Sequence, residues 1–71
     1  MATERILAHL VKAQEATAPE IAEALGLKPT VAYRALYTLS SRELVEDTGR
    51  RRTGPSGRPV KIWRTRRSGG R

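Results

Sequence analysis

The stretch Pro19–Leu39, PEIAEALGLKPTVAYRALYTL, contains two helical patterns separated by a glycine. Thr17 and Glu20 stand at the spacing of a capping box, in which the hydroxyl and the carboxylate each accept a backbone N–H, so a helix is predicted to begin after Thr17. Gly26 stands where a helix ends in a left-handed residue. A short helix over residues 18–25 is therefore expected.

A longer helix is predicted to follow at once, over about residues 29–42. Ala32, Leu36 and Leu39 recur at the spacing of one helical face, which we expect to be buried. The other side of this helix is polar toward its N-terminal end. The candidate ligand-contacting residues of this segment are Lys28, Pro29, Thr30, Tyr33, Arg34 and Tyr37.

The first segment of the chain also predicts a helix, from about Thr3 to Lys12. Its apolar residues form a single stripe of Ile6, Leu7, Leu10 and Val11. This stripe is expected to pack on the two later helices, or to share part of its surface with a second subunit in a homodimer. His9 falls off the stripe and is interpreted as a surface residue.

After the third helix the pattern changes to that of strands. Residues 44–49 are predicted to be extended, and residues 50–57 read as a loop because they are rich in Arg, Gly, Pro and Ser. Val60–Arg64 alternates like a strand. A β-hairpin with a long basic tip is therefore expected after residue 43. Residues 66–71 are interpreted as a basic disordered tail beyond a domain of residues 1–65.

Charge is distributed very unevenly along the 71 residues, whose net charge is +7. Residues 1–47 hold five basic and seven acidic side chains, whereas residues 48–71 hold nine basic side chains and no acidic one. A basic end on a mildly acidic body predicts a directed contact with a polyanion. Arginine predominates among these residues, and its planar guanidinium binds phosphates and guanine edges in a bidentate manner.

Composition argues against several other classes of protein. The chain has no cysteine and one histidine, so disulfides, a thiolate metal site and a histidine metal cluster are not expected, and no cofactor or small-molecule ligand is predicted. No paired nucleophile and base is evident, so an enzyme is not predicted. There is no apolar run that would span a membrane and no signal-peptide pattern. A cytoplasmic protein, nucleoid-associated if prokaryotic, is the expectation.

These segments together resemble the winged helix-turn-helix family of small bacterial and archaeal transcription regulators. The similarity lies in Pro19–Leu39, in Glu43–Glu46 and in Gly57–Trp63, and covers about residues 3–65. It implies an α+β fold in which three helices are followed by a two-stranded β-hairpin wing, with at most a one-residue bridge near Ala16. It also implies double-stranded DNA as the partner.

The resemblance assigns roles to the two basic elements. The helix over about residues 29–42 would read the major groove, and the wing would grip the minor groove or the backbone. The wing and strand residues predicted to contact DNA are Arg50, Arg51, Arg52, Arg58 and Lys61. Gly57-Arg58-Pro59 also matches the core of an AT-hook, and both interpretations place Arg58 near a minor groove.

Several alternatives stay open at this stage. The first is a DNA-architectural or replication and partition protein with low sequence specificity. Others are a winged helix that binds protein, an RNA-binding domain, and a Z-form nucleic-acid-binding domain, whose recognition tyrosine would match Tyr37. Strand alternation places Trp63 and Lys61 on one face and Val60 and Ile62 on the other, without telling which face is buried. Trp63 is expected to close the core.

Overall fold

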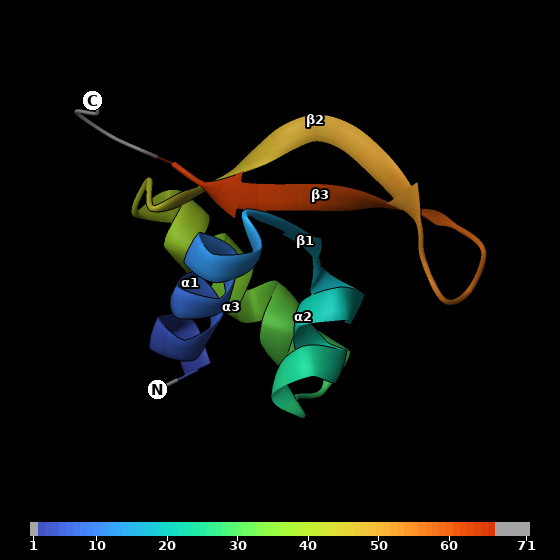
Figure 1. The fold of residues 1–71 in the computed structure, drawn as a ribbon, viewed down its shortest axis with the longest axis horizontal. Coiled ribbons are helices and arrows are strands. Elements are labelled where there is room, and N and C mark those ends of the chain that lie inside the picture. Colours follow the sequence, from blue (N-terminus) through green and yellow to red (C-terminus); the bar gives the residue numbers. More distant parts are fainter. Residues whose placement is uncertain (1, 67–71) are drawn as a thin grey trace.

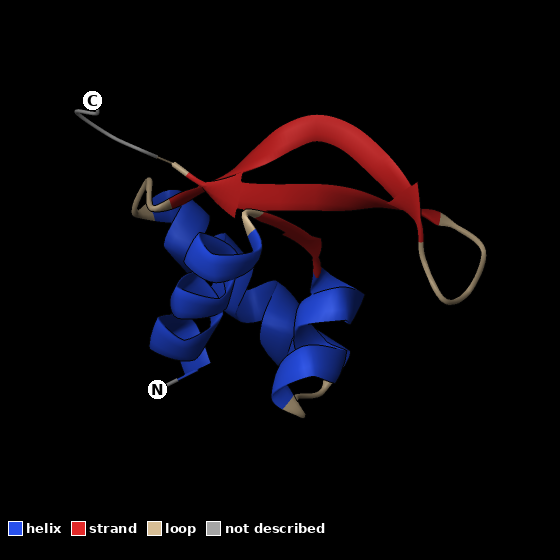
Figure 2. Cartoon of the chain, in the orientation of Figure 1, coloured by secondary structure: helices blue, strands red, loops and turns tan. Residues whose placement is uncertain are grey.

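Three helices lie against one face of a three-stranded antiparallel sheet (Figures 1 and 2). The computed structural model describes residues 2–66. In chain order the elements are α1 (Ala2–Ala13), β1 (Glu15–Thr17), α2 (Ala18–Leu25), α3 (Pro29–Ser41), β2 (Val45–Thr53) and β3 (Pro59–Thr65). The predicted α+β winged-helix class is confirmed, and the helix ends fall within the ordinary spread of helix boundaries. Within residues 2–66, every helix is too short or too polar to cross a membrane.

The sheet has the order β1-β3-β2, so β3 is its central strand. The segment between α1 and α2 contributes a full short strand where a single bridging residue was expected. Its register places Ala16 opposite Trp63 and Thr17 opposite Ile62. The hairpin is therefore joined through β3 to the segment that enters α2.

The predicted loop over residues 50–57 is wrong in its first half, because β2 continues to Thr53. Arg51 pairs with Lys61, and the ladder runs on to Thr53 opposite Pro59. The composition of the arginine run indicated a loop, but cross-strand hydrogen bonds join main-chain groups and do not require apolar side chains. A register shift between Asp47 and Arg51 marks a bulge, within which Gly49 has a φ of 85°.

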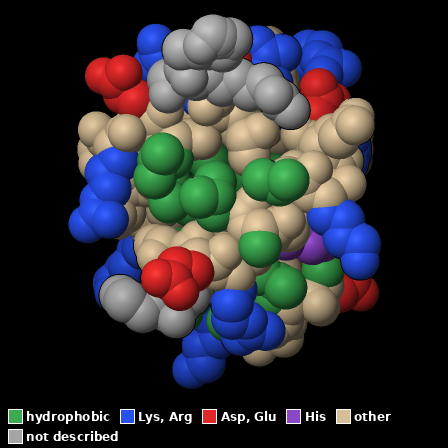
Figure 3. Space-filling view, turned by 60° about the vertical axis from the view of Figure 1, so that its left-hand side comes forward, with side chains coloured by type: hydrophobic (Ala, Val, Ile, Leu, Met, Phe, Trp, Pro, Cys, Tyr) green, Lys and Arg blue, Asp and Glu red, His purple; other side chains and the backbone are tan. Residues whose placement is uncertain are grey.

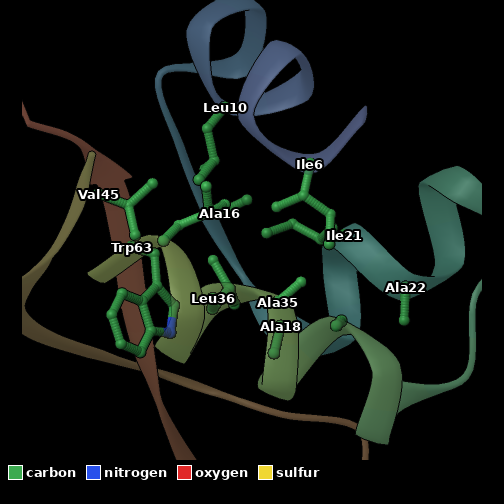
Figure 4. Close-up of a cluster of buried hydrophobic side chains, with 12 residues drawn as sticks. Ile6, Leu10, Ala16, Ala18, Ile21, Ala22, Ala35, Leu36, Val45 and Trp63 are labelled. Carbon is green, nitrogen blue, oxygen red and sulfur yellow. The ribbon is translucent and has the colours of Figure 1, made fainter. Parts of the chain in front are cut away.

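The core lies where α1, α2 and α3 meet the base of the sheet (Figure 4). Its largest fully buried apolar side chains are Ile6, Leu10, Ile21, Leu36 and Val45. Trp63 of β3 is 3% exposed and closes the core, as expected. The single stripe predicted for α1 is only half correct, because Val11 is 66% exposed. The apolar stripe of α1 is thus wider than the part of α1 that packs against the rest of the described chain.

The N-terminus of α2 forms the predicted capping box. The Glu20 N–H donates to Thr17 Oγ1 over 3.3 Å, and the Thr17 N–H donates to Glu20 Oε1 over 3.0 Å. Thr17 is 2% exposed, so both its backbone and its hydroxyl need partners within the protein. Gly26 ends the helix with a φ of 69°, in the left-handed region that its position predicts.

The carboxylate of Glu20 also receives the guanidinium of Arg52 from β2. Partial burial acts to raise the pKa of Glu20, but the hydrogen bond from the Thr17 backbone and the nearby Arg52 outweigh it, so the pKa is lowered from 4.5. A carboxylate whose pKa is lowered by folding contributes stability at pH values above its ordinary pKa. That contribution is lost as the pH falls through the lowered value.

Replacing Thr17 by Ala removes the capping oxygen and leaves the Glu20 N–H without its acceptor. We expect Thr17→Ala to lower the free energy of unfolding by about 1 kcal/mol, the usual cost of losing such a cap. Urea denaturation followed by circular dichroism measures it. Thr38→Ala, at an exposed position of α3, is the control and should leave the midpoint nearly unchanged. Equal midpoints for Thr17→Ala and wild type would contradict the assigned role of the cap.

Stability should decrease with pH below about 4.5, partly because Glu20 becomes protonated. Glu20→Gln keeps an acceptor for the Thr17 N–H but does not ionise. We expect this variant to be less stable than wild type at pH 7. It should also lose less stability between pH 6 and pH 3, a range that brackets the ordinary glutamate pKa of about 4.3. Thermal unfolding across this range measures the effect, with the exposed Glu23→Gln of α2 as control. Parallel curves for Glu20→Gln and wild type would contradict the assignment.

Candidate nucleic-acid interface

The exposed side of α3 is formed as its apolar spacing predicts. Ala32, Ala35, Leu36 and Leu39 are buried, which leaves the opposite side of the helix to solvent. The exposed members of the predicted contact set on this segment are Lys28, Pro29, Thr30, Arg34 and Tyr37. The side chain of Lys28 makes no capping hydrogen bond at the start of α3. The N-terminal end of α3 therefore presents a polar, positively charged surface.

The two tyrosines of α3 differ in their surroundings. Tyr33 is only partly exposed and packs against the core, whereas Tyr37 is 55% exposed. The sequence interpretation placed both on the polar side, because positions four apart on a helix differ by only about 40° around its axis. Tyr37 is thus the tyrosine exposed on this side of α3, whereas Tyr33 packs against the core.

Tyr37 connects α3 to the sheet. Its ring meets that of Trp63 edge to face, with centroids 5.8 Å apart and an interplanar angle of 84°. Lys61 Nζ lies 5.9 Å from the centroid of Tyr37 and 6.0 Å from that of Trp63, at the outer limit of a cation–π contact. The exposed side of α3 therefore meets the wing where Tyr37 lies beside Lys61.

The wing presents its basic residues on two different faces. Residues opposite one another in an antiparallel ladder share a face, and successive residues alternate. Arg51 pairs with Lys61 and so lies on the face of Tyr37. Arg52 pairs with Val60 and lies on the opposite face. We call these the inner face, toward α3, and the outer face.

The tip of the wing is the turn between Thr53 and Pro59. The Gly54 N–H donates to the Arg58 carbonyl over 2.8 Å, and Gly57 has a φ of 85°, which favours glycine. Arg58 is exposed at this tip. Within residues 2–66 it forms no ion pair, so its guanidinium is available to an external anion.

Most of the other basic residues of the C-terminal segment are paired with carboxylates. The pairs formed among residues 2–66 are Arg50–Glu15, Arg51–Asp47, Arg52–Glu20, Lys61–Asp47, Arg64–Glu46 and Arg66–Glu43. The Arg64 pair is short, with Nε 2.6 Å from Glu46 Oε2, whereas Lys61 Nζ lies 4.0 Å from Asp47 Oδ2. The basic end is thus partly neutralised by the acidic body.

The structure divides the predicted contact residues into two groups. The exposed residues of α3 meet the wing at Tyr37, which lies beside Lys61, and Lys61 is paired with Arg51. Arg58 is exposed farther out, at the tip of the wing. Arg50 and Arg52 lie on the outer face of the wing, bound to Glu15 and Glu20. Sequence reasoning missed these two carboxylates as partners of the wing. They are 35 and 32 positions away from the arginines, and no local pattern indicates such a pairing.

Comparison with solved structures finds ZitR and MarR proteins, some of them solved in complex with DNA. A variant of ZitR from Lactococcus lactis aligns with a TM-score of 0.73 and 27% identity, over 97% of this chain and 44% of its own. Another ZitR variant, solved in complex with DNA, aligns at 0.72 and 30% identity, over 94% and 42%. A MarR variant from E. coli, complexed with operator DNA, aligns at 0.70 and 26% identity, over 97% and 46%. This chain thus spans less than half the length of each.

Comparison of sequences identifies one family of proteins. A search of curated proteins gave no match. The profile of one family, described as the sugar-specific transcriptional regulator TrmB, matches residues 4–62. The matched segment contains most of α1, all of β1, α2, α3 and β2, and part of β3, and so includes both α3 and most of the wing. The chain therefore belongs to the TrmB family of transcriptional regulators.

Proposed function

We propose that this chain binds duplex DNA in a sequence-specific manner as the DNA-binding unit of a transcriptional regulator. The observation that carries the proposal is the meeting of the exposed side of α3 with the wing, where Lys61, paired with Arg51 in the sheet, lies beside Tyr37. In a helix-turn-helix the second helix enters the major groove. With α3 in that position, the wing would lie over the flanking minor groove or backbone.

Each exposed residue of α3 has a role that fits its chemistry. Arg34 presents a planar donor pair that matches the O6 and N7 acceptors of a guanine. Thr30 lies one turn earlier and would reach a phosphate or a thymine methyl group. Tyr37 lies about one turn later, beside the wing, and would contact the sugar–phosphate backbone. Lys28 and Pro29 begin the helix and would lie near a phosphate, which the helix N-terminus favours.

The comparisons support this proposal at the level of the class of protein. The ZitR and MarR structures that align with this chain include complexes with DNA, and the family is one of transcriptional regulators. We propose accordingly that the chain acts by binding and not by catalysis, in the cytoplasm and in contact with the chromosome. We assign this activity to residues 1–65. The predicted basic tail, residues 66–71, lies outside the described residues apart from Arg66.

Selection of bound sequences from a random duplex pool tests the proposal, at about 0.15 M salt so that weak charge contacts are screened. We expect a defined motif for wild type. Arg34→Ala should relax one base position of that motif and lose about 1–3 kcal/mol of discrimination there. Lys12→Ala, at an exposed position of α1, removes one positive charge away from the surface and should keep the motif.

A salt-sensitive interaction without an enriched motif would contradict sequence-specific regulation. It would favour the architectural alternative, in which the basic wing carries most of the affinity. A motif that Arg34→Ala leaves unchanged would contradict the placement of α3 in the major groove.

We also propose that the chain forms a homodimer through α1. Leu7, Val11 and Leu44 line an open groove between α1 and the end of the sheet, and Val11 and Leu44 are 66% and 38% exposed. Figure 3 shows hydrophobic side chains gathered on this side of the molecule. A second copy of the same face would cover them, because a two-fold axis brings identical patches together.

Sedimentation velocity tests the dimer. We expect a dimer for wild type and a monomer for Val11→Asp, because a carboxylate would be buried without a partner at the interface. Ala8→Asp adds the same charge at an exposed position of α1 outside the groove lining and should remain dimeric. The selected DNA motif should be an inverted repeat with half-sites about one helical turn apart. A wild-type monomer both in solution and on DNA would refute the proposal.

A further inference from the structure

Two ion pairs join the wing to the body of the domain across the outer face of the sheet. Arg50 contacts Glu15 of β1, and Arg52 contacts Glu20 at the N-terminus of α2. Both arginines belong to β2, whereas β3 lies between β2 and β1 in the sheet. Each guanidinium therefore reaches across the central strand to a carboxylate of the body, and that of Glu20 is also held by the Thr17 N–H in the capping box.

The register explains why these two arginines act together. Arg52 is paired with Val60 and follows Arg51, so it lies on the outer face. Glu15 is opposite Arg64, in the row next to that of Ala16 and Trp63, whose side chains face the core. Glu15 is thus also on the outer face, and Arg50 reaches it there. Ile62 also lies on the outer face, because it alternates with Trp63 along β3. It is 5% exposed although it is not part of the core cluster, which is consistent with the side chains of this face covering it.

The outer half of the wing has few other contacts to orient it. From Arg50 to Pro59 all residues except Gly54 are exposed, so no apolar side chain of this segment is anchored in the core. The bulge at Gly49 lies between this segment and the core. A shallow notch lined by Thr17, Glu20, Thr53 and Pro55 separates the start of α2 from the distal wing. The guanidinium of Arg52 meets Glu20 beside this notch.

We propose that Arg50 and Arg52 are positioning residues of the DNA-binding surface, which hold the wing at a set angle to α3 through Glu15 and Glu20. Arg51, Lys61 and Arg58 would then be the wing residues that contact DNA. The inference rests on the proposed function, and it divides the four arginines that sequence reasoning treated alike. Without the two ion pairs, the hairpin would sample several angles, and DNA binding would have to select one of them.

Charge exchange between Glu20 and Arg52 tests this inference by fluorescence anisotropy on the selected duplex. Arg52→Glu breaks the pair, and we expect affinity to fall on the order of fivefold, the size of a coupling between contacting residues. Glu20→Arg combined with Arg52→Glu restores an ion pair of reversed polarity and should recover most of the lost affinity. The matched control combines Arg52→Glu with Glu4→Arg, at an exposed position of α1, which has the same net charge but no restored pair, and should stay weak.

A direct phosphate contact of Arg52 predicts the opposite result. The reversed pair would then place a glutamate against the phosphate, and the double variant would bind as weakly as Arg52→Glu alone. Because Glu20 also caps α2, the double variant is first shown to be folded by its urea midpoint. Weak binding by the folded double variant would overturn the positioning role. Arg51→Glu should in addition reduce the slope of log affinity against log salt, by about 0.9 for each lost phosphate contact.

Amide hydrogen exchange of Arg51–Thr53 supplies a readout that needs no DNA. Exchange should become faster in Arg52→Glu and return toward the wild-type rate in the reversed pair, because the ion pair limits opening of the hairpin. Unchanged exchange in Arg52→Glu would refute the proposed restraint. A wild-type protein that binds no duplex would refute the proposed function instead, and the exchange experiment would still decide whether the ion pairs hold the wing.

Discussion

The packing of Trp63 on the central strand is the contact on which the rest of the architecture depends. Trp63 lies on β3, which is between β1 and β2 in the sheet. Its indole is buried in the core together with Val45, Ala16 and the buried residues of α3. Because β3 pairs with both other strands, this one side chain fixes the position of the whole sheet relative to the helices. The edge-to-face contact with Tyr37 then sets α3 beside the wing. The indole N–H has no hydrogen-bond partner within residues 2–66, so packing alone holds the ring.

This arrangement explains how a chain of 71 residues presents α3 and the wing in a defined relation. A chain of this length buries a limited apolar area, so most of its core side chains belong to the helices and the base of the sheet. The wing extends beyond that core, and the ion pairs of Arg50 and Arg52 join it to the body. Exposed ion pairs are individually weak, but several pairs that act on the same hairpin restrict it together.

The positive charge concentrated near the C-terminal end of the sequence is partly neutralised in the folded chain. The nine basic residues after position 47 would form a uniform positive end if the segment were extended. In the structure, body carboxylates such as Glu15, Glu20 and Asp47 approach the arginine run from two sides. On the inner face, Arg51 and Lys61 share the single carboxylate of Asp47, and Arg58 at the tip forms no ion pair within residues 2–66. On the outer face, Arg50 and Arg52 each have a carboxylate of their own. The field that DNA would meet is therefore narrower than composition predicts.

Local patterns were sufficient for the helices and for the class of fold. The capping box at Thr17, the left-handed Gly26 and the apolar spacing of α3 are each determined within about one or two turns of chain, and the structure agrees with them. The length of β2 was underestimated, because the arginine run is held extended by its pairing with β3 and not by its own propensity.

Periodicity, capping and composition predicted the three helices, the hairpin, the buried side of α3 and the excess of positive charge after residue 47. These properties are local, so they can be read from the order of residues. The folded chain was needed to show which face of β3 is buried, that Tyr33 packs against the core while Tyr37 is exposed, and that Arg50 and Arg52 meet Glu15 and Glu20. These contacts join residues more than thirty positions apart in the arginine pairs, where only the folded chain brings them within reach.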